Sequence, residues 1–357
     1  MRVVSVVGAR PQFVKLAPIA EAFARAGVDH KIIHTGQHYD PLLSDVFFSE
    51  LSIPAPDVHL GVGSGTHGVQ TGAILAALDT VLPSLSPDWV LVYGDTNSTL
   101  AAAVAAAKLH LPLAHLEAGL RSFNRILPEE HNRVLTDHAA DLLLAPTDDA
   151  ARHLANEGLR DRTVVVGDVM TDILLKVRDS VLDRTDFPTT AFGLEENEPY
   201  SIATIHRGEN TDHSDRLEAI LGALARVNHK VILLAHPRLK AWATQFNLPL
   251  TQGNLIGHDP LSYADLVCAV VNAQSVITDS GGLQKEAFLL RVPCTTVRAE
   301  TEWEETLRLG WNVLVEPGDP IVEAVGRPRP SPTTATPYGD GHAADRVATV
   351  LANRRLN

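Results

Sequence analysis

Acidic side chains with the chemistry for proton transfer gather between positions 113 and 133. Glu117 directly follows the apolar stretch 112–116, at the point where a strand should end. Glu129 comes just after Pro128, a residue that suits the first turn of a helix, where carboxylates meet the positive end of the helix dipole. We therefore expect both acids at the edge of an α/β sheet where ligands bind.

Further charged residues follow other predicted strands and favour one shared site. Asp95 directly follows an apolar strand, although an isolated aspartate there is more often a helix cap than a catalyst. Arg10 and Lys15 flank a helix start that suits an anionic group, yet each alone is equally well explained as a surface side chain. Arg133 lies four residues after Glu129 on one predicted helix, so these two residues could simply pair with each other.

The second half of the chain supplies a histidine and a turn suited to phosphate. His206 ends an apolar strand, where an imidazole can transfer protons or polarise a phosphate, although a lone histidine there is more often structural. Ser280, Gly281 and Gly282 connect a strand to a helix and would present backbone N–H groups to a diphosphate. Glu286, about one and a half turns into that helix, could reach ribose hydroxyls. The alternative is a purely structural role, in which Ser280 caps the helix and the glycines only allow the chain to turn.

The spacing of glycines and of ligand-type residues argues against several common sites. The first turn lacks a Gly-x-Gly-x-x-Gly fingerprint, so nicotinamide binding there is unsupported, and we find no Walker-type lysine loop. No set of His, Asp and Glu has metal-ligand spacing, so we expect no metal site. Cys268 and Cys294 lie in apolar runs and indicate buried thiols, not a disulfide or zinc site. This cysteine usage favours a reducing, cytoplasmic setting.

Strand and helix patterns alternate along the whole chain, which predicts parallel βαβ units and an α/β fold. We expect an N-terminal Rossmann-like domain over residues 1–169 with the acidic residues, and a second over 170–337 with the Ser-Gly-Gly turn. A last helix within 338–357 could pack back on either half, and we place it on the N-terminal domain. The predicted strands are 3–7, 30–34, 89–93, 112–116, 142–145, 163–166, 201–205, 231–235, 275–278, 294–297 and 313–315. The predicted helices include 11–26, 42–51, 69–82, 130–139, 148–157, 168–182, 214–227, 239–246, 263–273, 281–290 and 343–355.

Length and charge agree with this organisation. At 357 residues the chain is too long for one ordinary core, so two domains are expected. A formal net charge of −13 argues against nucleic-acid and anionic-membrane partners, although a local cationic cluster can still bind a phosphorylated ligand. No apolar run reaches about 18 residues, so we expect no membrane span. The chain enters its first strand directly, so we expect no signal peptide.

Taken together, these motifs resemble those of the non-hydrolysing UDP-N-acetylglucosamine 2-epimerases over nearly the whole chain. The matching segments are 8–12, 94–96, 115–121, 128–130, 132–133, 206–207, 209–210 and 279–282. The resemblance implies the two-domain fold of GT-B glycosyltransferases, with two Rossmann-like domains facing across a cleft. It also implies a homodimer that interconverts UDP-GlcNAc and UDP-ManNAc. A base removes the C2 proton, UDP leaves to give 2-acetamidoglucal, and UDP adds back with protonation on the other face. Because no oxidation occurs, we expect no nicotinamide cofactor and no obligatory metal.

The resemblance also assigns roles to the candidate residues. Asp95, Glu117 and Glu129 match the family's catalytic carboxylates, and His206 matches its histidine near the phosphates. Several acids in one closed cleft push their pKa values apart, so one can hold a proton while another does not. Which carboxylate serves which face of the sugar stays open. The remaining candidates bind the substrate: Arg10, Lys15, Arg133, Ser280, Gly281, Gly282 and Glu286.

Departures from the family pattern bear on the substrate. Trp303 lies where many members carry arginine, Gln12 replaces a glutamate, and the run 37–40 differs from the Gln-His-x-Gln of members with an allosteric UDP-GlcNAc site. Gln12, Trp303 and the run 65–68 look more like the branch that acts on UDP-2,3-diacetamido-2,3-dideoxyglucuronate and makes mannuronic sugars for surface polysaccharides. The substrate and the allosteric site therefore stay open.

Three other hypotheses share the same UDP site. A hydrolysing relative would release free ManNAc, and a GT-B glycosyltransferase would transfer the sugar to an acceptor. The three carboxylates with His206 disfavour a transferase, which needs an acceptor groove and usually fewer acids around C2. A non-catalytic UDP-sugar-binding protein is the least favoured hypothesis.

Overall fold

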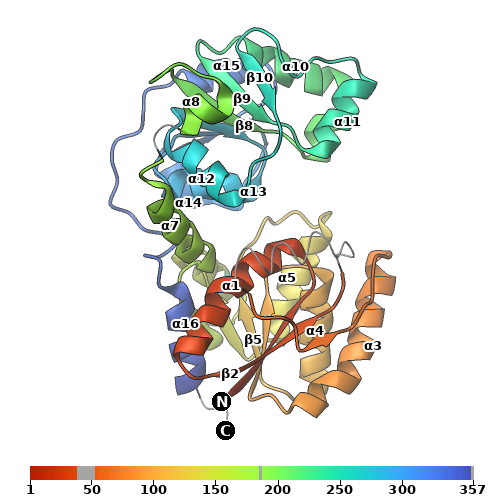
Figure 1. Cartoon of the computed structure of the whole chain (residues 1–357). Coiled ribbons are helices and arrows are strands. Elements are labelled where there is room, and N and C mark those ends of the chain that lie inside the picture. Colours follow the sequence, from red (N-terminus) through yellow and green to blue (C-terminus); the bar gives the residue numbers. More distant parts are fainter. Residues whose placement is uncertain (38–52, 185–186, 355–357) are drawn as a thin grey trace. The chain divides into compact units, whose positions relative to one another are not determined.

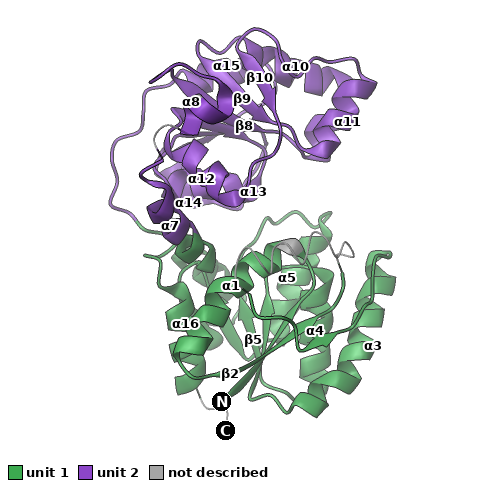
Figure 2. Ribbon diagram, viewed as in Figure 1, with its two compact units in different colours: residues 1–173, 336–357 green, residues 174–335 purple. Residues whose placement is uncertain are grey.

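A computed structural model describes residues 1–37, 53–184 and 187–354, apart from the side chains of Arg10 and Thr189. The chain forms two compact units, coloured separately in Figure 2. Unit 1 comprises Met1–Ile173 with Thr336–Asn357, and unit 2 comprises Leu174–Ala335. The final segment of the chain therefore belongs to the same unit as the N-terminus.

Within its described residues, unit 1 is built on a seven-stranded parallel sheet in the order β3-β2-β1-β4-β5-β6-β7 (Figure 1). The strands are β1 (Arg2–Val7), β2 (Asp29–His34), β3 (Val58–His59), β4 (Trp89–Tyr93), β5 (Leu113–Leu116), β6 (Leu142–Ala145) and β7 (Thr163–Val165). Strands β2 and β3 extend the sheet on one side of β1, and β4 to β7 extend it on the other side. The chain therefore changes the direction in which it adds strands between β1 and β4. In open α/β sheets, the crevice at the carboxyl ends of two such strands is where ligands bind.

Helices cover both faces of this sheet, so its central strands β1, β4, β5 and β6 are buried on both sides. The helices are α1 (Arg10–Arg25), α3 (His67–Leu85), α4 (Asn97–Lys108), α5 (Pro128–Ala139), α6 (Asp148–Asn156), the 3-10 turn η1 (Arg160–Arg162) and α16 (Ala343–Asn353). Helix α7 (Val169–Val181) begins in unit 1 and continues into unit 2. Val3 and Val7 of β1 face the core that contains α1 and α16, whereas Val4 and Val6 face α3 and α4. Figure 1 shows α16 beside α1, and its buried Val347 shares their core. The continuous apolar run of β1 is typical of a parallel strand covered on both faces.

Unit 2 repeats the architecture with a six-stranded parallel sheet in the order β10-β9-β8-β11-β12-β13 over its described residues. The strands are β8 (Tyr200–Thr204), β9 (Lys230–Leu234), β10 (Leu255–His258), β11 (Ser275–Thr278), β12 (Cys294–Thr296) and β13 (Asn312–Leu314). The helices are α8 (Phe187–Phe192), α9 (Gly208–Thr211), α10 (Ser214–Ala225), α11 (Pro237–Gln245), α12 (Tyr263–Val271), α13 (Gly281–Leu289), α14 (Glu304–Arg308) and α15 (Asp319–Val325). Here the order reverses between β8 and β11, the strands that precede His206 and Ser280.

The prediction of two parallel α/β halves is confirmed, and the differences lie at sheet edges and in short helices. The edge strands β3 and β10 were not predicted, because β3 is only two residues long and β10 contains Gly257, a residue that disfavours strands. The short helices α8, α9, α14 and α15 were also missed, since they are too brief to show a periodic apolar face. The predicted helix over 42–51 lies outside the described residues.

Helix α3 corrects the expectation that no stretch is apolar and long enough to span a membrane. By length and composition its 19 residues meet that requirement. A single such helix is weak evidence for a span, because helices of folded proteins pass the same test. In unit 1, α3 packs against α4, and its Ile74, Leu78 and Leu82 are buried in the core that these helices share.

Candidate active site

An ion pair between Lys15 and Glu117 lies beside the turn that leads to Asp95. Lys15 lies on α1, Glu117 directly follows β5, and Nζ of the lysine donates to Oε2 of the glutamate. A methyl group added at Gly94 would lie 3.1 Å from each of these two atoms. Burial acts to lower the pKa of Lys15, but the charges of Glu117 and Asp95 raise it on balance. The lysine therefore stays cationic among the acids.

The backbone at Glu117 is held in a conformation that few side chains adopt. Its φ is 71°, in the left-handed region, which costs about 1–3 kcal/mol at a non-glycine residue. The N–H groups of Glu117 and Ala118 both donate to the carbonyl of Leu144, at 3.1 and 3.2 Å. Gly119 follows with a φ of 85°, and a Cβ there would lie 2.4 Å from the carbonyl oxygen of Ala150, so only glycine fits. Strain of this kind concentrates at functional sites.

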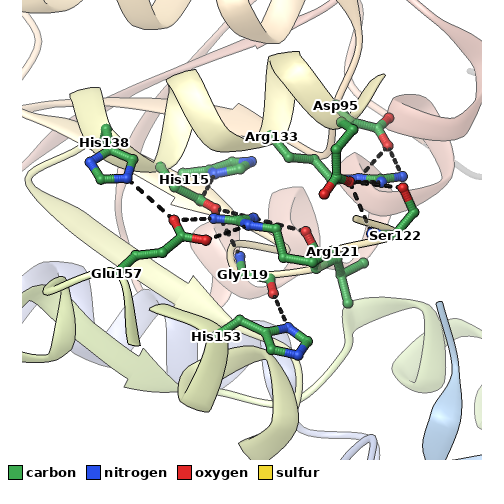
Figure 3. A network of polar contacts seen from close by, with 12 residues as sticks. Asp95, His115, Gly119, Arg121, Ser122, Arg133, His138, His153 and Glu157 are labelled. Atoms are coloured by element: carbon green, nitrogen blue, oxygen red, sulfur yellow. Dashed lines mark hydrogen bonds and ion pairs between the residues drawn. The ribbon is translucent and has the colours of Figure 1, made fainter. Parts of the chain in front are cut away.

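Asp95 is held by one turn of α5. Nε and Nη2 of Arg133 donate to Oδ2 of Asp95 at 3.0 and 2.7 Å, as Figure 3 shows. Asn132 donates to the backbone carbonyl of Asp95 at 2.9 Å. Burial acts to lower the pKa of Arg133, but Asp95 and Glu130 raise it on balance. Asp95 and Glu117 thus each carry a cationic partner at the carboxyl ends of adjacent strands.

The adjacent acids Glu129 and Glu130 have opposite environments. Glu129 is exposed on the first turn of α5, and no ion pair or side-chain hydrogen bond joins it to the residues that the structure describes. Glu130 is only 4% exposed and accepts hydrogen bonds from the backbone N–H groups of Ser122 and Phe123, at 2.9 and 3.0 Å. Burial raises the pKa of Glu130, but these donors and Arg133 lower it on balance. Glu130 therefore anchors the loop before α5, and Glu129 is available to a ligand.

In unit 2, a buried aspartate organises the turn that carries His206. Asp279 directly follows β11 and accepts from the backbone N–H groups of His206 and Arg207, at 3.1 and 2.9 Å, and from the side chain of Asn210 at 3.0 Å. Nδ1 of His206 lies 3.1 Å from Oδ1 of Asp279. Burial raises the pKa of Asp279, but His206 and Asn210 lower it on balance. An ionised carboxylate can only accept hydrogen bonds, so Nδ1 of His206 carries a hydrogen and donates a hydrogen bond to Asp279. Nε2 is therefore the ring atom available to a ligand.

The Ser-Gly-Gly turn begins α13 as the sequence predicts. Ser280 caps the helix, because its Oγ accepts from the N–H of Leu283 at 3.5 Å. Gly281 and Gly282 form the first turn, whose N–H groups have no acceptor within a helix. Glu286 lies further along α13, is 9% exposed, and accepts from the hydroxyl of Tyr263 at 3.0 Å.

The segment that departs from the family pattern borders this turn. A methyl group at Gly281 would lie 3.7 Å from Oε2 of Glu302, 3.9 Å from Nη1 of Arg298 and 3.9 Å from Nε1 of Trp303. Arg298 holds Glu302 with hydrogen bonds of 3.1 and 3.2 Å. Nζ of Lys285 lies 4.2 Å from the ring centroid of Trp303. The tryptophan is therefore packed in place beside the turn.

Gln12 lies under the first turn of unit 1. Its Oε1 accepts from the N–H groups of Gly8 and Ala9, at 2.8 and 3.1 Å. Its Nε2 donates to the carbonyl of Tyr93 at 2.9 Å and to the hydroxyl of Thr99 at 3.0 Å. A glutamate at this position could not donate to the carbonyl of Tyr93. The glutamine that replaces the family's glutamate therefore has a structural role inside unit 1.

Each unit brings most of its own candidate residues close together. Unit 1 brings Lys15, Asp95, Glu117 and Arg133 together, with Glu129 on the same helix as Arg133. Unit 2 connects His206 to the Ser280 turn through Asp279. Arg10 begins α1, and its side chain lies outside the part of the chain that the structure describes. Across residues 1–37, 53–184 and 187–354, no group of three or more His, Cys, Asp or Glu side chains could hold a metal ion.

Sequence reasoning missed six residues that hold the candidates in place: His115, Arg121, Glu130, Asn132, Asp137 and Asp279. Five of them lie inside motifs already singled out, so polar residues within those runs were the available signal. Asp137 offered none beyond its place on the predicted helix.

Comparisons with known proteins find relatives that match nearly the whole chain. The family model described as UDP-N-acetylglucosamine 2-epimerase matches residues 21–352. A Methanococcus maripaludis protein named UDP-N-acetylglucosamine 2-epimerase homolog is 43% identical over 358 residues, which cover 99% of this chain and 100% of that protein. The UDP-2,3-diacetamido-2,3-dideoxy-D-glucuronate 2-epimerase of Pseudomonas aeruginosa is 41% identical over 362 residues, or 99% of each chain.

Solved structures extend the match to the fold. The crystal structure of Methanocaldococcus jannaschii UDP-GlcNAc 2-epimerase in complex with UDP-GlcNAc and UDP has a TM-score of 0.86 and 37% identity, over 99% of each chain. The UDP-GlcNAc 2-epimerase from Neisseria meningitidis bound to UDP-GlcNAc has a TM-score of 0.87 and 27% identity, over 99% of this chain and 100% of that one. The GT-B-like α/β fold expected from the motifs is thereby confirmed.

Proposed function

The chain belongs to the UDP-N-acetylglucosamine 2-epimerase family, and we propose that it inverts C2 of a UDP-bound acetamido sugar without hydrolysing it. The enzyme is an isomerase, as its named relatives are. The observation that carries the proposal is the pair of carboxylates, Asp95 and Glu117, at the ends of adjacent strands β4 and β5. Each carboxylate is paired with a cation, Arg133 or Lys15. Acids and cations together suit a reaction that moves a carbon-bound proton while a diphosphate leaves.

The proposed reaction is an anti elimination followed by re-addition. A carboxylate takes the C2 proton, the C–H electron pair becomes the C1=C2 double bond, and the C1–O bond electrons leave with UDP. UDP then re-forms its bond to C1 of the 2-acetamidoglucal while a second acid protonates C2 from the opposite face. Asp95, Glu117 and Glu129 supply the base and the acid. Atoms and charge balance without an oxidant, and Lys15 and Arg133 offset the negative charge.

In unit 2, the proposal places the diphosphate on the N–H groups at the start of α13. Ser280, Gly281 and Gly282 would bind it. His206 would contact a phosphate oxygen through Nε2, because Asp279 occupies Nδ1. Glu286 would bind the ribose hydroxyls.

Two substrates fit the family. We propose UDP-GlcNAc, converted to UDP-ManNAc, as the simplest substrate. UDP-2,3-diacetamido-2,3-dideoxyglucuronate is the alternative, favoured by the 41% identity to the Pseudomonas enzyme and by the place of Trp303 beside Gly281. The homodimer, the cytoplasmic setting and the absence of a nicotinamide or metal cofactor stay predictions. The match to an epimerase family argues against the hypothesis that the protein is a glycosyltransferase.

The test is product analysis with each sugar nucleotide in turn. The purified protein is incubated with UDP-GlcNAc or with the diacetamido-uronate, and the products are separated by anion-exchange chromatography against standards. Conversion of one substrate to its C2 epimer supports the proposal, and the Glu117→Gln variant controls for contaminating activity. Free ManNAc with UDP would indicate a hydrolysing enzyme, and no conversion of either substrate would contradict the proposal.

A further inference from the structure

His115 is a buried histidine that lies between the two acid-bearing turns of unit 1. It lies on β5, is fully buried, and pairs in the sheet with Val92 and Leu143. Its Nε2 lies 2.8 Å from the carbonyl oxygen of Gly94, and its Nδ1 lies 2.7 Å from Oδ1 of Asp137. The proposed chemistry does not use this side chain directly.

The partners of His115 determine where its protons are. The carbonyl of Gly94 can only accept a hydrogen bond, so Nε2 must carry a hydrogen. The other oxygen of Asp137 pairs with Arg121 at 2.7 Å and accepts the N–H of Gly119 at 3.1 Å. Burial raises the pKa of Asp137, but His115 and Arg121 lower it on balance. Because an ionised carboxylate also only accepts, Nδ1 carries a hydrogen as well, and the ring is an imidazolium.

The charges around His115 balance, which permits a buried cation. Arg121 donates to both carboxylate oxygens of Glu157, each at 2.8 Å. His115 and Arg121 thus supply two positive charges, and Asp137 and Glu157 supply two negative ones. A buried charge is tolerated when it is paired and hydrogen-bonded in this way. His138 approaches Glu157 at 3.2 Å from the exposed rim of this cluster.

We propose that His115 is an imidazolium and the positioning residue that sets the distance between Asp95 and Glu117. Its Nε2 fixes the carbonyl of the residue before Asp95. Its Nδ1 fixes Asp137, which in turn holds the N–H of Gly119, two residues after Glu117. One side chain therefore connects the turns that follow β4 and β5. The positioning role rests on the proposed function, whereas the charge state does not.

A positioned charge of this kind should change how the reaction depends on pH. The charged groups around His115 are Lys15 from α1, Asp95 after β4, Glu117 after β5, Arg121 in the following loop, Arg133 and Asp137 from α5, and Glu157 at the end of α6. Replacing His115 with a neutral residue removes one positive charge and leaves Asp137 with one cation fewer. Losing a positive charge beside the acids should move the acidic limb of the rate profile to higher pH.

The charge state is tested by NMR of the full-length protein labelled with ¹⁵N-histidine, with the His115→Gln variant used to assign the signals. We expect both ring nitrogens of His115 to carry a hydrogen at about pH 8, because each of them faces a hydrogen-bond acceptor. A neutral ring with one unprotonated nitrogen at that pH would overturn the assignment. This measurement does not depend on enzymatic activity, and the variant that assigns the signals does not have to be active.

The positioning role is tested by kinetics of His115→Gln beside His138→Gln, which removes a histidine from the exposed rim of the same cluster. We expect His115→Gln to lower kcat about ten- to a hundredfold, the usual cost of small misplacement. We also expect the acidic limb of its rate profile to lie at higher pH than that of the parent protein. The Kd for UDP should stay unchanged, because the proposed diphosphate turn lies in unit 2. His138→Gln should match the parent protein in all three quantities.

The outcomes separate the inference from the function. An unchanged kcat and pH profile in a folded His115→Gln protein would overturn the positioning role. If that variant does not fold, Asp137→Asn takes its place, and it is expected to convert His115 to a neutral ring in the NMR spectrum; a ring that stays doubly protonated would contradict the inference. If the parent protein epimerises neither sugar but His115 is an imidazolium, the proposed function fails and the charge assignment stands.

Discussion

The adjacent residues Glu129 and Glu130 allow a matched test of the site, because equal substitutions should have opposite effects. Oε2 of Glu130 accepts from the N–H and hydroxyl of Ser122 and from Nη1 of Arg133, and Oε1 accepts from the N–H of Phe123. In a Glu130→Gln variant, one acceptor oxygen becomes an NH₂ group that faces a donor. The remaining bonds also lose the charge that strengthens them.

The size of the effect follows from these contacts. Hydrogen bonds to a charged group contribute about 1.5–3 kcal/mol each, and an unsatisfied buried donor costs about 1–3 kcal/mol. We expect Glu130→Gln to lower the free energy of unfolding by about 2–4 kcal/mol. Glu129 is exposed, so Glu129→Gln should change the free energy of unfolding by less than about 0.5 kcal/mol. If Glu129 is a catalytic acid or base, the same change should lower turnover by about a hundredfold or more.

Urea unfolding followed by circular dichroism measures the stability of both variants, and initial rates of epimerisation measure turnover under conditions where both are folded. Near-normal turnover of Glu129→Gln at unchanged stability would remove Glu129 from the catalytic set. A Glu130→Gln protein as stable as the parent would refute the conclusion that Glu130 anchors the loop before α5.

Further predictions concern other parts of unit 1. Asp95→Asn and Glu117→Gln should each lower turnover by about a hundredfold or more, and normal rates in both would remove the carboxylate pair from the mechanism. Gln12→Glu should lower the melting temperature, since a carboxylate cannot donate to the carbonyl of Tyr93; an unchanged melting temperature would contradict the internal role of that amide. Burial lowers the pKa of His30 from 6.5 to about 4, so the folded chain binds this proton more weakly than the unfolded chain. The stability associated with His30 is therefore complete above about pH 6.5 and declines toward about pH 4, by up to about 3 kcal/mol. His30→Gln should reduce this acid sensitivity in urea unfolding at the two pH values, and an equal loss in both proteins would contradict it.

Much of the fold could be predicted because most of the described strands alternate with helices long enough to show a periodic apolar face. The run of valines in β1 and the apolar β4 mark strands buried on both faces, and the glycine directly after each, Gly8 or Gly94, marks its carboxyl end. Asp95 and Glu117 could be placed on this basis, because carboxyl ends of parallel strands lie at one edge of a sheet. Edge strands such as β10 could not, since their pattern is interrupted by residues such as Gly257.

The contacts within the site were harder to predict from residue types. Nothing in the pair Glu129 and Glu130 says which side chain points back to the loop, because that depends on the rotation of α5 relative to Ser122. The role of Asp137 depends on a partner, His115, that lies 22 residues earlier in the chain. Such long-range hydrogen bonds between elements become visible only once the sheet sets those elements side by side.

The central claim is that the protein transfers the C2 proton of a UDP-bound acetamido sugar. Proton NMR of the protein with UDP-GlcNAc in deuterated water tests that claim most directly, and the diacetamido-uronate serves as the second substrate. The account predicts loss of the C2 proton signal of one of these substrates as solvent deuterium enters, together with growth of the C2 epimer. Retention of the C2 proton in both substrates, with UDP still bound by the protein, would contradict it.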